Sequence, residues 1–180
     1  MGILSFLNPN DSKKINLTQE AKDFIDVLNT TKSLEPISVD VLLDKNEDAY
    51  FIEQDIDYGE ERNVRISKGR GVSFRVIRGV YYHTGGSQGR YLPEIERVDK
   101  GNLYLTNKRA IFKGRFETRT FDLNKIISIE NFSDAIVLSG VTKKTPYFFV
   151  YNPYLWKVRF MILSQVDNLK KLPHLSFEFA

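Results

Sequence analysis

Turn-forming residues recur every few positions between Lys100 and Tyr151, and they leave apolar segments that are too short for helices. Gly, Asn, Asp, Ser and Pro separate stretches rich in Leu, Ile, Val, Phe and Tyr. Several short apolar segments with frequent turn signals are typical of a β-sandwich or barrel. We therefore predict strands over residues 103–106, 109–112, 118–123, 125–130, 135–138 and 147–151.

The stretch before Lys100 continues this pattern. Apolar and polar side chains alternate after Pro36, and again where Val72, Phe74 and Val76 are separated by Ser73 and Arg75. Alternation of this kind predicts half-buried strands. We predict strands over 37–43, 49–52 and 70–82, an acidic loop over 53–63 and a flexible turn over 84–89.

Two helices are expected to flank the β region. Thr18 is a good N-cap for a helix over residues 19–28, whose apolar side chains share one face. Asn152 and Pro153 begin a second helix, in which apolar residues recur at helical spacing as far as Leu169. An apolar helix of this kind is expected to cover the open end of a barrel. The fold class is therefore mainly β with α, with a leader and short helix over 1–36, one domain over 37–172 and a tail over 173–180 that could add an edge strand.

The composition excludes several classes of site. The chain has no Cys and only two His, His83 and His174, so disulfides, thiolate metal sites and His-rich metal sites are excluded. The acidic residues of 53–60 lack the spacing of a calcium-binding loop. No apolar run reaches the roughly 18 residues that cross a bilayer. We predict no metal and no cofactor. The expected location is cytoplasmic, and peripheral association with a membrane is left open.

Charge is strongly segregated along the chain. Residues 1–61 hold five Lys against fourteen acidic residues, whereas residues 62–119 hold fourteen Lys or Arg against four acidic residues. Such a contrast indicates either an anionic partner for the basic part, or acidic and basic segments that pack near each other within one domain.

One stretch resembles a known family. The residues from 101 to 112 read Gly-Asn-Leu-Tyr-Leu-Thr-Asn-Lys-Arg-Ala-Ile-Phe, and they resemble the signature of GRAM domains and related bacterial PH-like domains. Residues 122–129, 143–149 and 41–47 resemble the neighbouring strands of that family, so the resemblance covers about 37–169. Ala110 is smaller than the residue usual at that place, and the helix near Thr18 lies outside the family pattern.

The resemblance implies a fold and a class of function. The expected fold is a PH-like, strongly bent antiparallel sandwich or partial barrel, capped at one end by the C-terminal helix. The family implies binding of lipids or proteins, often without enzymatic activity. Within the signature, Thr106 and Asn107 can hydrogen-bond backbone groups where the strand ladder is interrupted, and Arg109 can pair with a carboxylate such as Asp99 or Asp122.

Cationic residues are the candidate ligand-binding groups. Two basic loops, at 68–71 and 113–115, combine Gly with Lys and Arg, which suits an anion held by backbone N–H groups and guanidinium forks. The alternative is a solvated strand face paired with the acidic N-terminal third. The candidate anion-binding residues are Lys68, Arg70, Arg75, Arg78, Lys113 and Arg115, within a wider basic set that includes Arg90, Lys108, Arg109 and Arg119.

The sequence predicts a non-catalytic interaction module that docks onto a protein partner or an anionic membrane surface. The alternative is single-stranded nucleic acid bound by the basic 62–119 face, because its aromatic residues could stack bases. No recognition-helix or RNA-binding signature supports that alternative. Catalysis has little support, since residues 84–89 match neither a nucleophile elbow nor a phosphate-binding loop. Trp156 is expected to be buried, whereas Phe177 and Phe179 are left open as a patch for a protein.

Overall fold

The structure, a computed structural model, describes the backbone of residues 18–68, 72–77, 80–84, 88–140, 142, 144–166 and 168–175. Side chains are described for the same residues except those between 62 and 93. The described residues exclude the leader before Thr18, and the tail beyond Leu175 with its predicted edge strand. They also exclude parts of the predicted basic loop at 68–71 and of the predicted turn over 84–89.

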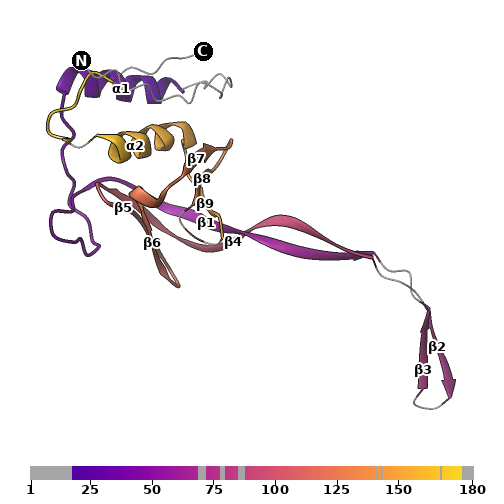
Figure 1. Cartoon of the computed structure of the whole chain (residues 1–180). Helices are drawn as coiled ribbons and strands as arrows, with labels where there is room; N and C mark the ends of the chain where they lie inside the picture. The colour runs from indigo at the N-terminus through magenta and orange to yellow at the C-terminus, as the bar shows by residue number, and fades with distance from the viewer. Residues whose placement is uncertain are drawn as a thin grey trace.

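A seven-stranded antiparallel sheet forms the centre of the molecule (Figure 1). Its strands lie in the order β6-β5-β4-β1-β9-β8-β7, and β6 and β7 do not pair within the described chain, so the sheet is not closed. The fold class predicted from the sequence, mainly β with a C-terminal helix as cap, is confirmed. The sheet strands are β1 (Ala49–Lys68), β4 (Gln88–Thr106), β5 (Arg109–Gly114), β6 (Thr118–Asp122), β7 (Ser128–Asn131), β8 (Ile136–Ser139) and β9 (Pro146–Phe149), and a 3-10 turn, η1 (Leu123–Lys125), follows β6.

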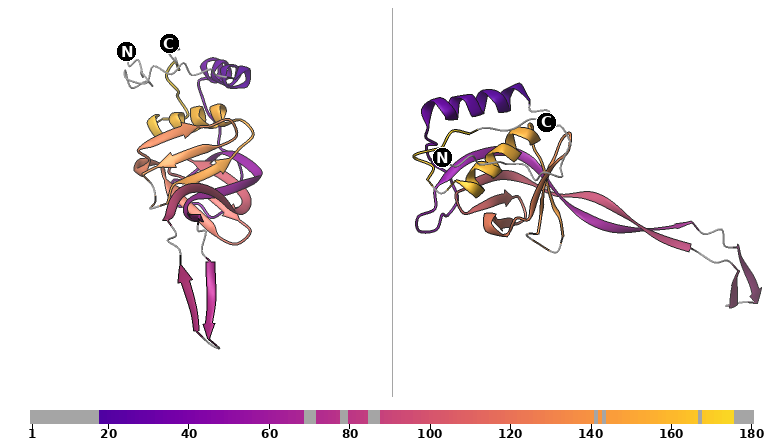
Figure 2. Two further views of the ribbon diagram at one scale, coloured as in Figure 1. Left: turned by 90° about the vertical axis from the view of Figure 1, so that its right-hand side faces the viewer. Right: turned by 45° about the horizontal axis from the view of Figure 1, so that its top comes forward.

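Strands β1 and β4 continue far beyond their neighbours. They pair with each other from Ala49 opposite Thr106 to Lys68 opposite Gln88, whereas β9 pairs with β1 only over residues 57–60. Their distal parts leave the sheet as a two-stranded ribbon, and β2 (Val72–Ile77) and β3 (Val80–Thr84) form a separate hairpin between them (Figures 1 and 2). We call residues 62–93 the arm, and the other described residues the body.

The prediction of a loop over 53–63 was wrong, because these residues lie within β1. Their acidic side chains have partners on the body: Glu53 accepts the Trp156 indole N–H, and Asp57 pairs with Arg97 at 2.7 Å. Ile56 and Tyr58 turn inward and are buried. Acidic residues are thus compatible with a strand here because cations and donors from other elements satisfy them.

The inner face of the sheet carries an aromatic core. Tyr58 stacks on Phe112 with ring centroids 5.0 Å apart, and Phe148 packs against both rings. Helix α2 (Pro153–Gln165) covers this face, with Trp156 and Phe160 fully buried as predicted for Trp156. Its N-terminus has the predicted cap, since the Asn152 side chain accepts a hydrogen bond from Leu155 N.

The N-terminal helix belongs to the same core. Helix α1 (Gln19–Thr31) is capped by Thr18 as predicted, and it buries Ala21, Ile25 and Leu28. It packs near α2, on the opposite side of the molecule from the β5–β6 turn (Figure 1). The Arg159 guanidinium of α2 lies 4.8 Å from the centroid of the Phe51 ring, a cation–π contact that fixes α2 against β1.

Further boundaries differ from the prediction. The stretch predicted as one strand over 70–82 contains two paired strands, β2 and β3, and the strand predicted over 125–130 begins only at Ser128. Residues 37–43 form no strand and make only an isolated bridge between Ile37 and Ala49, because Asp40 is drawn to Lys113 and Tyr104 instead. Helix α2 ends at Gln165, so Leu169 contributes to the core from the following turn. Neither described helix, each of 13 residues, is long and apolar enough to cross a membrane.

Candidate functional site

The family-like signature forms a structural turn. The Thr106 hydroxyl, fully buried, accepts hydrogen bonds from the backbone N–H groups of Lys108 and Arg109 at 3.1 and 2.9 Å. Asn107 accepts from Asp48 N at 3.0 Å. Both side chains therefore satisfy backbone groups where β4 gives way to β5, as the sequence predicted. Gly101 of the same signature is required for a steric reason, since a Cβ there would lie 2.1 Å from the carbonyl oxygen of Lys113 on the neighbouring strand.

Arg109 pairs with a carboxylate that the sequence did not indicate. Its Nε and Nη2 atoms donate to Glu47 at 3.0 and 2.9 Å, so the predicted partners Asp99 and Asp122 were wrong. The Glu47 side chain is completely buried and also accepts from Thr106 and from Asp44 N. Burial alone would raise the pKa of Glu47, but these hydrogen bonds and the Arg109 charge lower it below its ordinary value. Arg109 is thus a structural residue here.

Asp99 plays an equivalent role at the other end of β5. Its carboxylate is fully buried and accepts hydrogen bonds from the backbone N–H groups of Lys100 and Arg115 at 2.8 and 3.0 Å. The Arg119 guanidinium lies 3.3 Å away. Burial would raise the pKa of Asp99, but the backbone donors hold it below its ordinary value. The charged form of Asp99 therefore stabilises the β5–β6 turn.

The two candidate anion-binding residues on the body differ in their surroundings. Lys113 Nζ pairs with Asp40 at 2.7 Å. Arg115 lies exposed on the β5–β6 turn. Most other cations between 94 and 119 are neutralised by ion pairs, largely with acids from the N-terminal third, so the expected packing of acidic and basic segments is confirmed for the body. These pairs are Arg97–Asp57, Lys100–Asp55, Arg109–Glu47 and Arg119 with Asp99 and Glu117.

The remaining candidate residues belong to the arm. Lys68 ends β1 and Arg75 lies in β2, whereas Arg70 and Arg78 lie outside the described residues. Lys68 is opposite Gln88, and Lys113 is opposite Asn102. At about 3.3 Å per residue, roughly 45 Å of β4 separates these two positions. The structure therefore does not bring Lys113 and Lys68 into one site.

The arm concentrates the positive charge of the chain. Residues 62–93 contain seven Lys or Arg and no Asp or Glu, whereas the rest of the chain holds 19 Lys or Arg against 23 Asp or Glu. The formal charge is therefore +7 for the arm and −4 for the rest. The cations of the arm are Arg62, Arg65, Lys68, Arg70, Arg75, Arg78 and Arg90.

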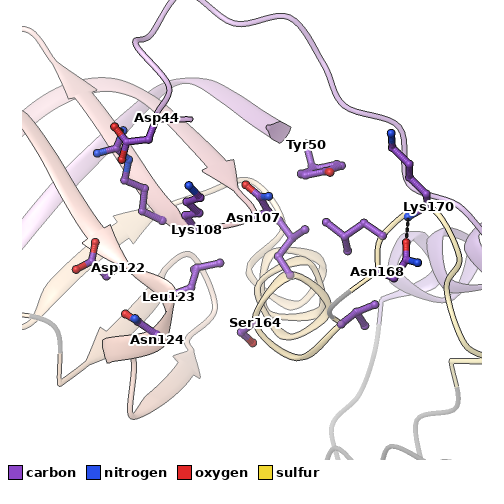
Figure 3. Close-up of a pocket in the computed structure, with 14 residues that line it drawn as sticks. Asp44, Tyr50, Asn107, Lys108, Asp122, Leu123, Asn124, Ser164, Asn168 and Lys170 are labelled. Carbon is purple, nitrogen blue, oxygen red and sulfur yellow. Dashed lines mark hydrogen bonds and ion pairs between the residues drawn. The ribbon is translucent and has the colours of Figure 1, made fainter. Parts of the chain in front are cut away.

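The body has a groove of about 730 Å³ around the C-terminal end of α2 (Figure 3). Most of its charged side chains already have partners: Arg109 binds Glu47, Lys108 Nζ donates to Lys45 O at 2.6 Å, and Asp122 pairs with Lys125. Lys170 and Asn168 lie together on one side, where the backbone N–H of Lys170 donates to the side-chain Oδ1 of Asn168 at 3.2 Å. The groove thus offers little charge for binding an ion. Among the described residues no cluster of acidic or His side chains could hold a metal.

Sequence reasoning missed the residues that hold the body together. Glu47 was visible only as a member of a charged stretch, and Asp99 was considered only as a partner for Arg109. Nothing in their spacing marks either carboxylate as buried. The available signal was the signature itself, because its buried Thr106 and Arg109 require an acceptor. The comparisons with known proteins add no further residues: no family model matches the chain, and no curated protein or solved structure does so.

Proposed function

We propose that the chain is a non-catalytic, PH-like interaction module that docks onto an anionic membrane surface through the arm. The observation that carries this proposal is the separation of charge: seven cations without an acidic residue in the arm, against a net negative remainder. Long-range attraction to an anionic surface follows the unpaired charge of a protein, and paired cations contribute little to it.

The architecture supports the PH-like part of the proposal. The resemblance in residues 101–112 implies a bent antiparallel sheet capped at one end by a C-terminal helix. An open seven-stranded sheet with α2 over its inner face agrees with that expectation. The arm is then formed by the distal ends of β1 and β4 and by the residues between these two strands.

The arm also has the composition of a segment that lies on a membrane. Each Lys or Arg near an anionic surface contributes about 1 kcal/mol, so a few of the seven are enough for detectable binding. A two-stranded ribbon alone is marginally stable in water, and a surface that covers one face would stabilise it. The apolar and aromatic residues available for such a contact are Val64, Ile66, Val72, Phe74, Val76, Ile77, Val80, Tyr81, Tyr82, Tyr91 and Leu92.

Single-stranded nucleic acid is the second candidate partner. The observation that favours it is the mixture of Arg with Phe74, Tyr81, Tyr82 and Tyr91 in the arm, because aromatic rings stack on bases while cations follow the phosphates. We rank it second because the apolar residues of the arm outnumber these four rings.

Vesicle flotation tests the proposal. The full chain is mixed with vesicles of phosphatidylcholine alone, or with vesicles that also contain about 30% phosphatidylglycerol, in about 50 and 500 mM salt. We expect flotation only with the anionic vesicles, and much less of it in high salt. Equal binding to neutral vesicles, or no binding at all, would contradict the proposal. Displacement of the chain from vesicles by a single-stranded oligonucleotide at equimolar phosphate would favour the second candidate, and capture by a protein alone would point to the protein partner that the sequence also allows.

A further inference from the structure

The turn between β5 and β6 exposes a large aromatic residue. Phe116 is 87% exposed, although the other Phe residues of β5 and β6, Phe112 and Phe121, are buried in the core. Single exposed apolar residues are common on protein surfaces and need no explanation by themselves. Phe116 differs because of how firmly its backbone is held.

The buried carboxylate of Asp99 fixes this turn. It accepts hydrogen bonds from three successive backbone N–H groups, those of Arg115, Phe116 and Glu117, at 3.0, 3.4 and 3.3 Å. Gly114 is packed directly against the same carboxylate, since a Cβ there would lie 2.0 Å from Asp99 Oδ2. A charged acceptor with several donors is a strong constraint. The Phe116 ring is therefore held in water by a rigid turn.

The charges beside Phe116 leave one cation available. Glu117 pairs with Arg119 at 2.8 Å, and Lys100 pairs with Asp55 at 2.8 Å. In the part of the chain that the structure describes, the Arg115 guanidinium has no ion pair within 4.0 Å. The tip of the turn thus presents an aromatic ring next to a guanidinium that forms no ion pair with the described residues, a combination suited to the boundary between lipid headgroups and acyl chains.

The turn and the arm leave the sheet at the same end of β4 and β5. Gly114 is opposite Gly101, and Arg115 N donates to Lys100 O at 3.0 Å, seven residues along β4 from the end of the arm at Pro93. Both project away from α1 and α2 (Figures 1 and 2).

We propose that Phe116 and Arg115 form a second membrane contact, with the Phe116 ring inserted at the headgroup–acyl boundary and Arg115 at a lipid phosphate. This inference rests on the proposed function, because the arm supplies the attraction that brings the turn to the anionic bilayer. The turn then fixes the orientation of the body on the membrane.

The test places a fluorophore at the turn. The only Trp, Trp156, is 1% exposed, so Phe116→Trp adds a reporter whose emission is separated from a buried background. The vesicles contain phosphatidylglycerol and brominated phosphatidylcholine. We expect a blue shift and quenching for Phe116→Trp, and neither for the wild type nor for the matched control Val27→Trp on the exposed face of α1. In addition, Phe116→Ala should weaken vesicle binding about tenfold, and Arg115→Ser about fivefold.

The outcomes separate the two proposals. If Phe116→Trp binds the vesicles like the wild type but shows no quenching, the inserted turn is excluded and the membrane function stands. If Val27→Trp is quenched equally, the turn has no special place on the membrane, and the inference also fails. If the wild type does not bind the vesicles, both the function and this inference are overturned. Urea unfolding midpoints equal to that of the wild type establish that the variants are folded.

Discussion

The body and the arm carry positive charge in different ways. On the body, cations such as Arg109 and Arg119 are tied to buried carboxylates and hold strands and turns in place. In the arm, seven cations occur without any acidic residue in the same segment. The difference teaches that the overall charge of +3 describes neither region. Cations of the body contribute to folding, whereas the arm has a concentration of positive charge that no acidic residue of its own sequence balances.

The largest expected effect comes from removing arm charge. Arg65→Ser, Lys68→Ser and Arg75→Ser together should weaken binding to anionic vesicles about 100-fold, because each cation contributes about 1 kcal/mol. The unfolding midpoint should not change. The matched body variant replaces Lys100, Lys125 and Lys144, each ion-paired, by Ser. It should bind within about threefold of the wild type, since those charges are neutralised and screened. Equal losses of vesicle affinity in the two variants would show that cations of the arm and of the body contribute equally to binding.

Breaking a buried ion pair of the body should lower the stability of the fold and leave vesicle binding unchanged, the reverse of the effect expected for the arm. Glu47→Gln leaves Arg109 without its charged acceptor, and we expect a loss of about 3 kcal/mol in the free energy of unfolding, measured in urea. Asp44→Asn is the control, because Asp44 is exposed and lies 3.6 Å from the same guanidinium. It should change stability far less. Vesicle binding at 15 °C, where the variant is folded, should be unchanged; a loss of binding would show that Glu47 acts on more than the body.

Removing the charge of Asp99 should destabilise the chain somewhat less. In Asp99→Asn the charged hydrogen bonds to the β5–β6 turn are lost, at a cost of about 2 kcal/mol in the free energy of unfolding. The exposed Asp55→Asn, which loses only its pair with Lys100, should leave the urea midpoint unchanged. If Asp99→Asn is as stable as the wild type, the turn is held by other contacts.

The stability of the body should depend on pH in the acid range. Glu47 and Asp99 both have a pKa below the ordinary value. Their stabilisation is fully present above the unfolded values of about 4 and is lost as pH falls through the lower folded values. The free energy of unfolding should therefore be flat from about pH 7 to 5 and decline below about pH 4. The Glu47→Gln, Asp99→Asn double variant should decline less steeply, and a curve parallel to that of the wild type would assign the acid sensitivity to other carboxyls.

The smallest effect is expected at Lys113. Its ammonium group is bound to Asp40, so Lys113→Ser should leave vesicle binding within about twofold, whereas Arg75→Ser alone should weaken it about fivefold. Titration of both variants with anionic vesicles compares a candidate anion-binding residue of each region directly. A larger loss of vesicle affinity for Lys113→Ser than for Arg75→Ser would indicate that the membrane contact lies on the body.

Local patterns in the sequence predicted the local structure well. The Thr18 and Asn152 caps and the turn at Asn107 follow from short-range spacing, and the structure has them. The charged network depends on distant residues instead. Arg109 finds its acceptor 62 positions earlier, at Glu47, and no periodicity links the two.

The same limit explains the errors around β1. The acidic stretch after Ile52 resembled a loop because its partners, such as Arg97 and Trp156, lie far along the chain. Residues 37–43 alternate like a strand, yet Asp40 is held by Lys113 instead of a neighbouring strand. Four of the six candidate anion-binding residues lie in one segment of the sequence, but nothing in the sequence predicted that this segment leaves the sheet as an arm. Its separation from Lys113 required the pairing of β1 with β4 and the register of β4.

Amide hydrogen exchange on the vesicle-bound chain tests the central claim most directly. Exchange of the full chain is compared with and without anionic vesicles, and peptides covering residues 62–93 are compared with those covering 98–125. The account predicts that new protection is concentrated in the arm, with a smaller gain at residues 115–117, while the ion-paired strands of the body are unchanged. Protection gained on the body, with an arm that exchanges as rapidly as in the free chain, would contradict it.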